Sequence, residues 1–264
     1  MTKIVRRCAT AVCAFLFLAF AGTASGADVV VMSSGGFTAA LKDLVPGFEQ
    51  ATGHRVRLVL GPSMGTAPEA IPNRLARGEP ADLLVMVGSA LSGLEAKGVV
   101  RADSHVDLAR SKIAMAVRAG RPKPDIGSVE AFKRALLAAK SIAYSDSASG
   151  VYIETEMYRK LGLEDQLKGK SRMIVAEPVG DVVARGEAEI GFQQVSELLP
   201  VKGIEFVGTI PDEVQKVTVF SAGIPAAAHD AAAGKALLDY LWSPAAAPTV
   251  VKTGLEPITR TTGR

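Results

Sequence analysis

A repeated pattern limits the fold of this chain more than any other feature: a short apolar run, a turn rich in serine and glycine, and then a helix with one apolar face. The first repeat consists of an apolar run at 29–32, a turn at 33–36 and a helical pattern that begins near Phe37. Continuous apolar runs are typical of strands buried on both faces of a parallel sheet, with helices covering those faces. The pattern therefore predicts an α/β fold.

The same pattern recurs along the chain without a long linker. Further strand-like runs lie at residues 57–60, 82–87, 112–117, 142–144 and 217–220. Helical patterns lie at residues 68–76, 129–137, 151–161 and 231–242. Any boundary between two lobes must therefore consist of short crossovers.

An internal repeat suggests two lobes of similar construction. Residues 76–79 and 184–187 both read Ala-Arg-Gly-Glu, and each is followed at once by a strand-like segment. Glycine commonly ends a helix because it adopts the left-handed conformation there. Two lobes built on one plan would produce this pattern; the alternative is a chance similarity between two helix ends.

The N-terminal segment is predicted to be an export signal. Three basic residues precede an apolar stretch at 11–21, and small residues at 24–26 offer a cleavage site. An apolar stretch of this length fits a secretory signal and is too short to span a bilayer. We therefore expect residues 1–26 to be a signal peptide and the mature protein to be periplasmic; the alternative is a buried N-terminal helix.

Cysteine and charge content exclude several classes of protein. Cys8 and Cys13 both lie in the predicted signal, so the mature chain can form neither a disulfide bond nor a thiolate metal site. Without residues 1–26, 27 basic residues balance 27 acidic ones. Such a chain has no overall positive charge to attract nucleic acid or an anionic membrane. Aromatic residues, at 5%, are also too few for a base-stacking platform.

Three turns rich in serine and glycine are candidates for an anion-binding site. They lie between strand and helix at 33–36, 61–66 and 145–150. A helix N-terminus presents free N–H groups and a partial positive charge, glycine allows close approach, and serine adds a hydroxyl donor. In open α/β sheets, ligands bind at the carboxyl ends of the strands. The alternative is that each serine only caps its helix.

No cofactor and no metal ion are expected. No turn matches the dinucleotide-binding or P-loop pattern, so the predicted ligand is a small anion rather than a nucleotide. His54, His105 and His229 are scattered in polar stretches, which does not indicate a metal site. Arg74 follows the second turn and is a candidate contact for the anion.

With these turns, the sequence resembles the periplasmic solute-binding proteins of the molybdate-binding family. The resemblance covers nearly all of the predicted mature chain and is carried by residues 29–38, 77–83, 149–152 and 180–182. It implies the two-lobed type II periplasmic binding protein fold, with the ligand in a cleft between the lobes. Lobe 1 would comprise residues 27–108 and 218–264, and lobe 2 residues 109–217. We expect a monomer.

The resemblance also implies which residues bind the ligand. The family's second-turn serine is matched by Ser63, its helix-start amide by Ser149, and a further amide falls near Val179. Two positions depart from the family, because its first-turn serine falls on Gly36 and its oxyanion-donating tyrosine on Gln194. These changes favour a larger anion than molybdate. Together with the turns, the predicted ligand-binding residues are Ser33, Ser34, Gly35, Gly36, Ser63, Met64, Gly65, Thr66, Arg74, Ser147, Ser149, Gly150, Val179, Gly180 and Gln194.

The turns at 61–66 and 144–150 resemble those of a branch of this family that includes aconitate isomerase, which interconverts cis- and trans-aconitate. This resemblance implies an enzyme that shifts a proton along an allylic tricarboxylate. The candidate acids and bases are Asp146, Tyr152 and Glu177. The alternative is a binding protein without catalytic activity, which delivers molybdate, tungstate or an organic anion to the permease of an ABC transporter.

Overall fold

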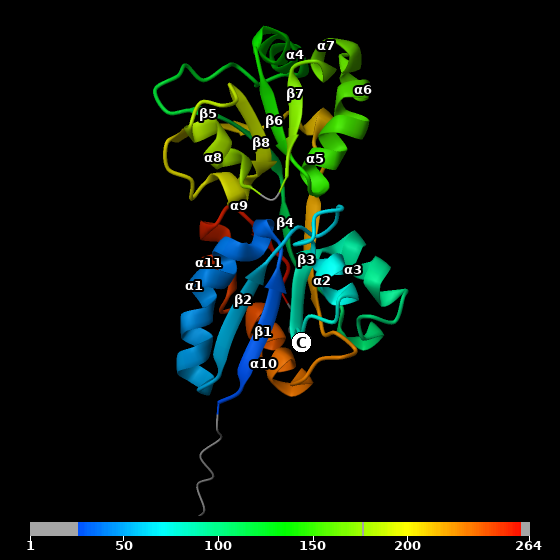
Figure 1. Ribbon diagram of the computed structural model, residues 1–264. Coiled ribbons are helices and arrows are strands. Elements are labelled where there is room, and N and C mark those ends of the chain that lie inside the picture. Colours follow the sequence, from blue (N-terminus) through cyan, green and yellow to red (C-terminus); the bar gives the residue numbers. More distant parts are fainter. Residues whose placement is uncertain (1–25, 176, 260–264) are drawn as a thin grey trace, which may run out of the picture.

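Two sheets, each covered by helices, form two lobes that lie one above the other in Figure 1. The computed structural model describes residues 26–175 and 177–259. The predicted signal segment lies outside these residues, apart from Gly26. The predicted α/β fold with two lobes is confirmed.

The first sheet has six strands, of which β2, β1 and β3 run parallel. The strands lie side by side in the order β11 (Glu256–Pro257), β4 (Val106–Ser111), β10 (Thr218–Gly223), β3 (Leu83–Val87), β1 (Asp28–Ser33) and β2 (Arg55–Leu60). The helices of this lobe are α1 (Gly35–Thr52), α2 (Ile71–Ala76), α3 (Gly88–Glu95), α10 (Ala231–Leu241) and α11 (Ala247–Lys252). β10 pairs antiparallel with both β3 and β4.

The second sheet has five strands, of which β7, β6 and β8 run parallel. The strands lie in the order β7 (Ser171–Ile174), β6 (Ile142–Ser145), β8 (Ile190–Gln194), β5 (Ile113–Arg118) and β9 (Ile204–Thr209). The helices of this lobe are α4 (Val129–Ala138), α5 (Ala148–Tyr152), α6 (Tyr158–Leu161), α7 (Glu164–Lys168), α8 (Val179–Ala184) and α9 (Val195–Leu198). A π-helical turn, Ile153–Met157, joins α5 to α6.

The apolar run of β3 is continuous because both faces of its sheet are covered. Successive side chains of a strand point to opposite faces. Leu83, Val85 and Val87 accordingly join the core formed with α1 and α10. Leu84 and Met86 join a separate core formed with α2 and α3. Burial of each such side chain stabilises the fold by about 1.5–3 kcal/mol, so neither face tolerates a polar residue.

The chain crosses between the lobes through two short segments. β4 ends at Ser111 in the first sheet, and β5 begins at Ile113 in the second. The return leads from the turn Asp212–Val214 to β10, which begins at Thr218. The Gln215 side chain joins the two crossings, since its Oε1 accepts from the N–H of Ile113 at 2.8 Å and its Nε2 donates to the Ile113 carbonyl at 2.9 Å. We call Lys112 and residues 215–217 the hinge.

The repeat predicted from the two Ala-Arg-Gly-Glu segments is present in the structure. α2 and α8 both end at the alanine, Gly78 and Gly186 have φ angles of 80° and 77°, and the strands β3 and β8 follow. Strands β7 and β9 lie at the edges of the second sheet and interrupt their apolar residues with polar ones, so the apolar pattern does not predict them. The proposed division into residues 27–108 with 218–264, and 109–217, stays a prediction.

Replacing Gln215 with alanine is expected to lower the free energy of unfolding by about 1–3 kcal/mol, because the N–H of Ile113 loses its partner and the Ile113 carbonyl keeps only the N–H of Ile210. Urea denaturation followed by circular dichroism measures this change. Glu213→Gln, at an exposed position beside the hinge, is the control and should change stability by less than about 0.5 kcal/mol. Equal stability of Gln215→Ala and the parent protein would contradict the role assigned to this side chain.

Candidate functional site

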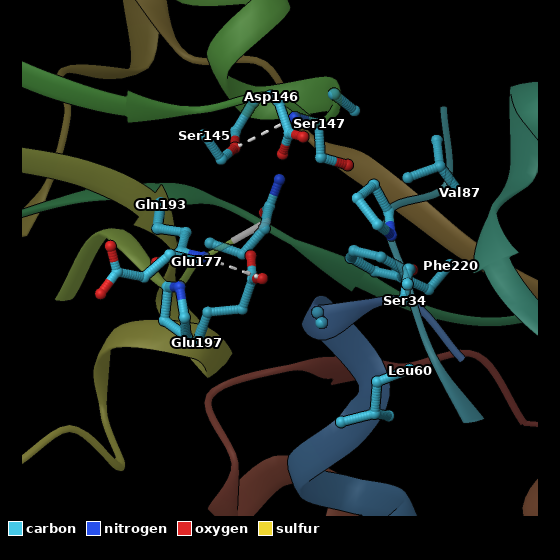
Figure 2. A pocket seen from close by; sticks show the side chains of 18 of the residues that line it. Ser34, Leu60, Val87, Ser145, Asp146, Ser147, Glu177, Gln193, Glu197 and Phe220 are labelled. Atoms are coloured by element: carbon cyan, nitrogen blue, oxygen red, sulfur yellow. Dashed lines mark hydrogen bonds between the residues drawn. The ribbon is translucent and has the colours of Figure 1, made fainter. Parts of the chain in front are cut away.

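A cavity of about 310 Å³ lies between the lobes, where the three parallel strands of each sheet end (Figure 2). It is lined by residues of both lobes: Ser34, Gly35, Gly36, Leu60, Gly61, Pro62, Glu69, Val87, Ser145, Asp146, Ser147, Ala148, Ser149, Glu177, Pro178, Gln193, Gln194, Glu197 and Phe220. Its volume is in the range of small-molecule sites.

Ser34 presents an unpaired hydroxyl at this cavity. It precedes α1, but its side chain makes no capping hydrogen bond, and its buried hydroxyl has no partner. A buried hydroxyl without a partner is destabilising, so it marks a position where a bound ligand would complete the hydrogen bond. Gly35 and Gly36 begin an 18-residue helix, and their N–H groups have no acceptor within it. Free N–H groups and a hydroxyl at the start of a helix are the donors that commonly hold anions in proteins.

Two glycines allow close packing at the start of α1. A side chain at Gly36 would overlap the ring of Phe220, and one at Gly35 would overlap Oε1 of Glu197. Gly35 therefore lets a carboxylate of the second lobe lie against the first turn of α1. A hydrogen bond of 2.6 Å from the Ser196 hydroxyl to the Gly36 carbonyl joins the lobes at the same point.

Ser33 and Ser63 are buried and hydrogen-bonded within the protein. The Ser33 hydroxyl donates to the carbonyl oxygen of Ser34 at 3.1 Å, and the Ser63 hydroxyl accepts from the N–H of Val87 at 2.9 Å. Neither lines the cavity. Of the same turn, Gly61 and Pro62 line the cavity, whereas Met64, Gly65 and Thr66 do not. These residues shape the strand ends beside the cavity, and direct contact with a ligand stays a prediction for them.

The turn after β6 supplies five neighbouring lining residues, 145–149. The hydroxyls of Ser145 and Ser149 lie 3.2 Å apart, and the N–H of Ser147 lies 3.4 Å from the Ser145 hydroxyl. A side chain at Gly150 would overlap the backbone of Ser145, so only glycine allows this tight turn. The Ser147 side chain makes no capping hydrogen bond, which argues against the reading that these serines only cap their helices.

Two glutamines at the end of β8 complete the cavity. Oε1 of Gln193 accepts from the N–H of Val179 at 3.0 Å. The Val179 N–H, which the sequence predicts as a donor to the ligand, therefore already has a partner within the protein. Nε2 of Gln194 donates to the Thr218 hydroxyl at 3.0 Å, which leaves the buried Oε1 of Gln194 without one. A half-turn of the Gln194 amide would let Thr218 donate instead and would present an N–H group at that position.

Glu197 is a carboxyl group of the cavity that the sequence did not single out. Its Oε1 accepts from Nε2 of Gln193 at 3.0 Å. Burial raises the pKa of Glu197 to about 7, and Asp146 adds to this rise, while hydrogen bonds from the Gln194 backbone and the Gln193 side chain oppose it. A carboxyl group with a pKa near 7 exchanges protons at neutral pH, which suits general acid–base chemistry.

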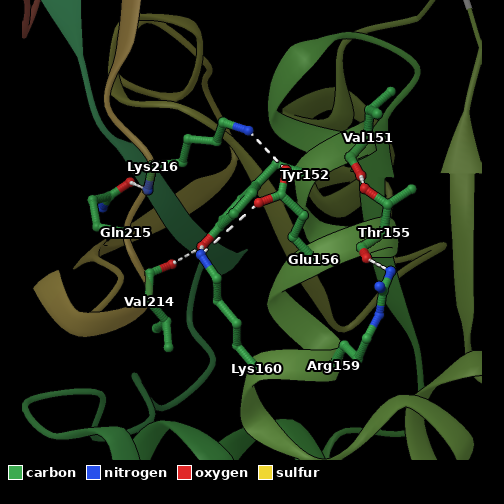
Figure 3. A network of polar contacts seen from close by, with 9 residues as sticks. All are labelled: Val151, Tyr152, Thr155, Glu156, Arg159, Lys160, Val214, Gln215 and Lys216. Carbon is green, nitrogen blue, oxygen red and sulfur yellow. Dashed lines mark hydrogen bonds and ion pairs between the residues drawn. The ribbon is translucent and has the colours of Figure 1, made fainter.

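Tyr152 lies away from this cavity, in the polar network of Figure 3. Its hydroxyl donates to the carbonyl oxygen of Val214 at 2.7 Å, and the ammonium groups of Lys160 and Lys216 lie 5.1 and 5.0 Å from its ring centre. Lys216 also pairs with Glu156 at 2.8 Å. Tyr152 therefore connects the second lobe to the hinge.

Two of the predicted site residues, Arg74 and Glu177, pair with charged side chains of the protein, and a third, Gly180, does not line the cavity. Arg74 pairs with Glu79 at 2.7 Å and is not among the lining residues. Glu177 lines the cavity but pairs with Arg185 at 2.7 Å. Gly180 lies behind the lining residues, where a side chain would crowd a valine. Of these three, only Glu177 is placed to face a ligand.

The cavity is acidic. Among the described residues that line it, four carry a carboxyl group and none carries a basic side chain. The carboxyl groups belong to Glu69, Asp146, Glu177 and Glu197. An anion must therefore be held by neutral N–H and O–H donors and by helix N-termini. Because the pKa of Glu197 is raised to about 7, a large fraction of this carboxyl is uncharged at neutral pH, which lowers the repulsion.

No group of three or more His, Cys, Asp or Glu side chains within residues 26–175 and 177–259 is arranged to hold a metal ion. No helix in the same residues is long and apolar enough to cross a membrane.

Some cavity residues had no distinct signal in the sequence. Glu197, Gln193 and Phe220 line the cavity but are not among the residues that the sequence indicates as binding or catalytic. Gln193 and Glu197 follow the rule that ligands meet the carboxyl ends of parallel strands, because β8 ends at Gln194 and α9 follows. Applied to the strand after the second Ala-Arg-Gly-Glu segment, that rule would have pointed to both of them.

Two α/β lobes with a cavity between them are the architecture of a solute-binding protein. Residues 29–256 match the family of bacterial extracellular solute-binding proteins, and the chain belongs to that family. The predicted resemblance is thereby confirmed.

The chain is similar in sequence or structure to several characterised proteins. An aconitate isomerase from a Pseudomonas species is 52% identical over 87% of this chain and 88% of its own length. The molybdate-binding protein of Azotobacter vinelandii is 27% identical over 88% of this chain and 90% of its own. The solved structure of the periplasmic molybdate-binding protein of that organism matches with a TM-score of 0.70 at 21% identity, covering 88% of this chain and 100% of the other.

Replacing Glu197 with glutamine is expected to stabilise the protein more at pH 8 than at pH 5. Folding raises the pKa of Glu197 from 4.5 to about 7, so the folded state binds this proton more tightly than the unfolded state does. The resulting stability is complete below about pH 4.5 and is lost as the pH rises through about 7. The difference in free energy of unfolding between the variant and the parent protein should therefore increase by on the order of 2–3 kcal/mol from pH 5 to pH 8.

Urea denaturation at the two pH values measures this difference. Glu177→Gln is the control, because it removes only an exposed ion pair and should change stability by less than about 1 kcal/mol at either pH. An equal effect of Glu197→Gln at pH 5 and pH 8 would contradict a carboxyl group whose charge is disfavoured by burial.

Proposed function

We propose that this protein is an aconitate isomerase, which interconverts cis- and trans-aconitate. The observation that carries the proposal is the 52% identity to the Pseudomonas aconitate isomerase over 87% of this chain. The cavity supports it, because unpaired polar groups of Ser34 and Gln194 lie beside a carboxyl group, Glu197, whose pKa is raised to about 7.

The reaction needs only a proton shift. Aconitate carries a methylene group between one carboxylate and a carbon–carbon double bond. When the methylene proton leaves, its electron pair forms a new double bond, and the electrons of the old double bond take up a proton at the far carbon. The new double bond can form in either geometry. No atom or electron is gained overall, so acids and bases of the chain suffice without a cofactor.

The site offers donors where negative charge develops. Loss of the methylene proton gives a dienolate, whose charge spreads onto the neighbouring carboxylate. The N–H groups at the start of α1 and the Ser34 hydroxyl would hold that carboxylate, and the serines of the turn 145–149 would hold another. Fixed donors aimed at a developing charge lower the barrier, because they need no reorganisation during the reaction.

A second candidate is a binding protein without catalytic activity, which would deliver an oxyanion or an organic anion to the permease of an ABC transporter. The 27% identity to the Azotobacter molybdate-binding protein favours it. The packing of Phe220 against Gly36 argues for a ligand other than molybdate, because the position of the family's first serine cannot carry a hydroxyl here.

Turnover separates the two candidates. Purified protein incubated with trans-aconitate should produce cis-aconitate, followed by chromatography. Binding of aconitate without turnover would leave only the binding protein. A large rise in melting temperature with micromolar molybdate, and none with aconitate, would overturn the preference for a tricarboxylate.

Ser34→Ala is expected to lower kcat/KM for aconitate by roughly 10- to 100-fold, because a hydrogen bond to a charged group contributes about 1.5–3 kcal/mol. Steady-state kinetics measures the change. Ser92→Ala removes an exposed hydroxyl on α3, away from the cavity, and should leave kcat/KM unchanged. Unchanged kinetics for Ser34→Ala would place the ligand elsewhere.

We also propose that residues 1–26 direct export to the periplasm. Their basic and apolar pattern and the extracellular family of the chain support this. N-terminal sequencing of the protein from a periplasmic fraction should begin at or near Ala27. A full-length chain confined to the cytosol would contradict export.

A further inference from the structure

Glu197 occupies a position that the proposed function leaves without an assigned role. We propose that Glu197 is the general base of the isomerisation, and that the start of α1 holds a substrate carboxylate beside the carbon from which Glu197 removes the proton. This inference rests on the proposed function and deepens it.

The argument begins with the contact between Glu197 and Gly35. A side chain at Gly35 would overlap Oε1 of Glu197, so this carboxylate lies directly against the first turn of α1. The same turn carries the free N–H groups of Gly35 and Gly36 and follows the unpaired Ser34 hydroxyl. A base that touches the carboxylate-binding group of a site lies beside the carbon attached to that carboxylate. This is the carbon that loses its proton in an allylic shift.

The Glu197 carboxylate is also held in one orientation. Nε2 of Gln193 donates to Oε1 of Glu197 at 3.0 Å (Figure 2), and the oxygen of the same Gln193 amide is fixed by the N–H of Val179 at 3.0 Å. Such second contacts keep a catalytic group in its productive geometry. The proton that Glu197 accepts turns it into a carboxylic acid. That acid returns a proton to the far carbon of the dienolate, so that protons and charge balance over one turnover.

The other predicted acids and bases are less suited. Tyr152 donates its hydroxyl proton to the Val214 carbonyl and does not line the cavity. Glu177 is exposed and pairs with Arg185. Asp146 lines the cavity from the turn after β6, and its charge disfavours the ionised form of Glu197. Asp146 thus strengthens the basicity of Glu197.

Several charged groups surround Glu197. Asp146, Glu177 and Glu69 line the same cavity. A neighbouring cavity, which Glu197 also lines, is lined by Lys42, Asp181 and Lys202. Burial and Asp146 together raise the pKa of Glu197 to about 7 in the free protein. The negative charges of bound aconitate raise this pKa further.

A pH profile follows from this setting. Because the base must be ionised, kcat/KM should rise with pH and level off above about 7, the pKa of Glu197 in the free protein. The profile of kcat reports the substrate complex and should therefore have its midpoint at a higher pH than the profile of kcat/KM. The titration of aconitate itself is the same for every variant, so differences between profiles belong to the protein.

The decisive experiment compares Glu197→Gln, Glu197→Asp and the parent protein in turnover and in binding. General base catalysis contributes about 10²- to 10⁴-fold, so Glu197→Gln should lower kcat by at least about 100-fold. Aconitate should still raise its melting temperature, because the carboxylate-binding groups remain. Glu197→Asp keeps a carboxyl group but withdraws it by one methylene, and should retain part of the activity together with the pH dependence. Glu213→Gln, exposed beside the hinge, should match the parent protein.

The outcomes separate the two levels of the proposal. If the parent protein has no turnover, the proposed function is wrong and this inference is wrong with it. If the parent turns over aconitate and Glu197→Gln keeps more than a tenth of that kcat, only the inference is overturned. If Glu197→Gln loses aconitate binding together with turnover, Glu197 is a binding group, and its assignment as the base is wrong. The Glu197→Asp variant gives the same readouts should the glutamine variant fail to fold.

Discussion

The position of the cavity depends on the hinge, because the hinge sets how the two sheets face each other. Two crossings, tied together by the Gln215 side chain, turn the three parallel strands of each sheet toward one space. Each parallel strand is followed along the chain by a helix, directly after β3 and β8 and through a connecting segment after the others, so helix N-termini of both lobes lie toward that space. The partial positive charges of these helix ends therefore add up at a single place. A site for an anion arises from topology before any particular side chain is considered.

The side chains around that space are not what an anion site would suggest, because the described lining residues are acidic and include no basic group. Neutral donors and helix ends must supply all of the attraction. The raised pKa of Glu197 has two effects, one on the charge of the cavity and one on the strength of the carboxylate as a base. Its burial beside Asp146 raises its pKa, which lowers the repulsion of an incoming anion at neutral pH. The same rise makes its ionised form a stronger base. Substrate binding and base strength are therefore coupled through one carboxyl group.

The sequence predicted the architecture well, because apolar runs such as that of β3 report burial on both faces, and because two Ala-Arg-Gly-Glu segments marked equivalent helix ends. It also placed the turns at 33–36 and 145–150 at the cavity. It could not tell which hydroxyl of a turn is used internally, as that of Ser63 is by Val87. Nor could it tell that Tyr152 faces the hinge, since this depends on the rotation of one helix. The environment of Glu197 is created by Gly35 of the other lobe, and no local pattern carries that information.

The hydrogen bond from the Ser196 hydroxyl to the Gly36 carbonyl ties the second lobe to the first turn of α1, which also lines the cavity. Gly35 and Gly36 of this turn line the cavity, while the carbonyl oxygen of Gly36 is anchored to the second lobe. Parting the lobes breaks that anchor and carries the acidic wall of the second lobe away from the donors of the first. A ligand that binds the donors of both lobes at once stabilises the state in which the lobes are in contact. By thermodynamic reciprocity, that state also binds the ligand more tightly. Capture and closure are then one equilibrium rather than two successive events.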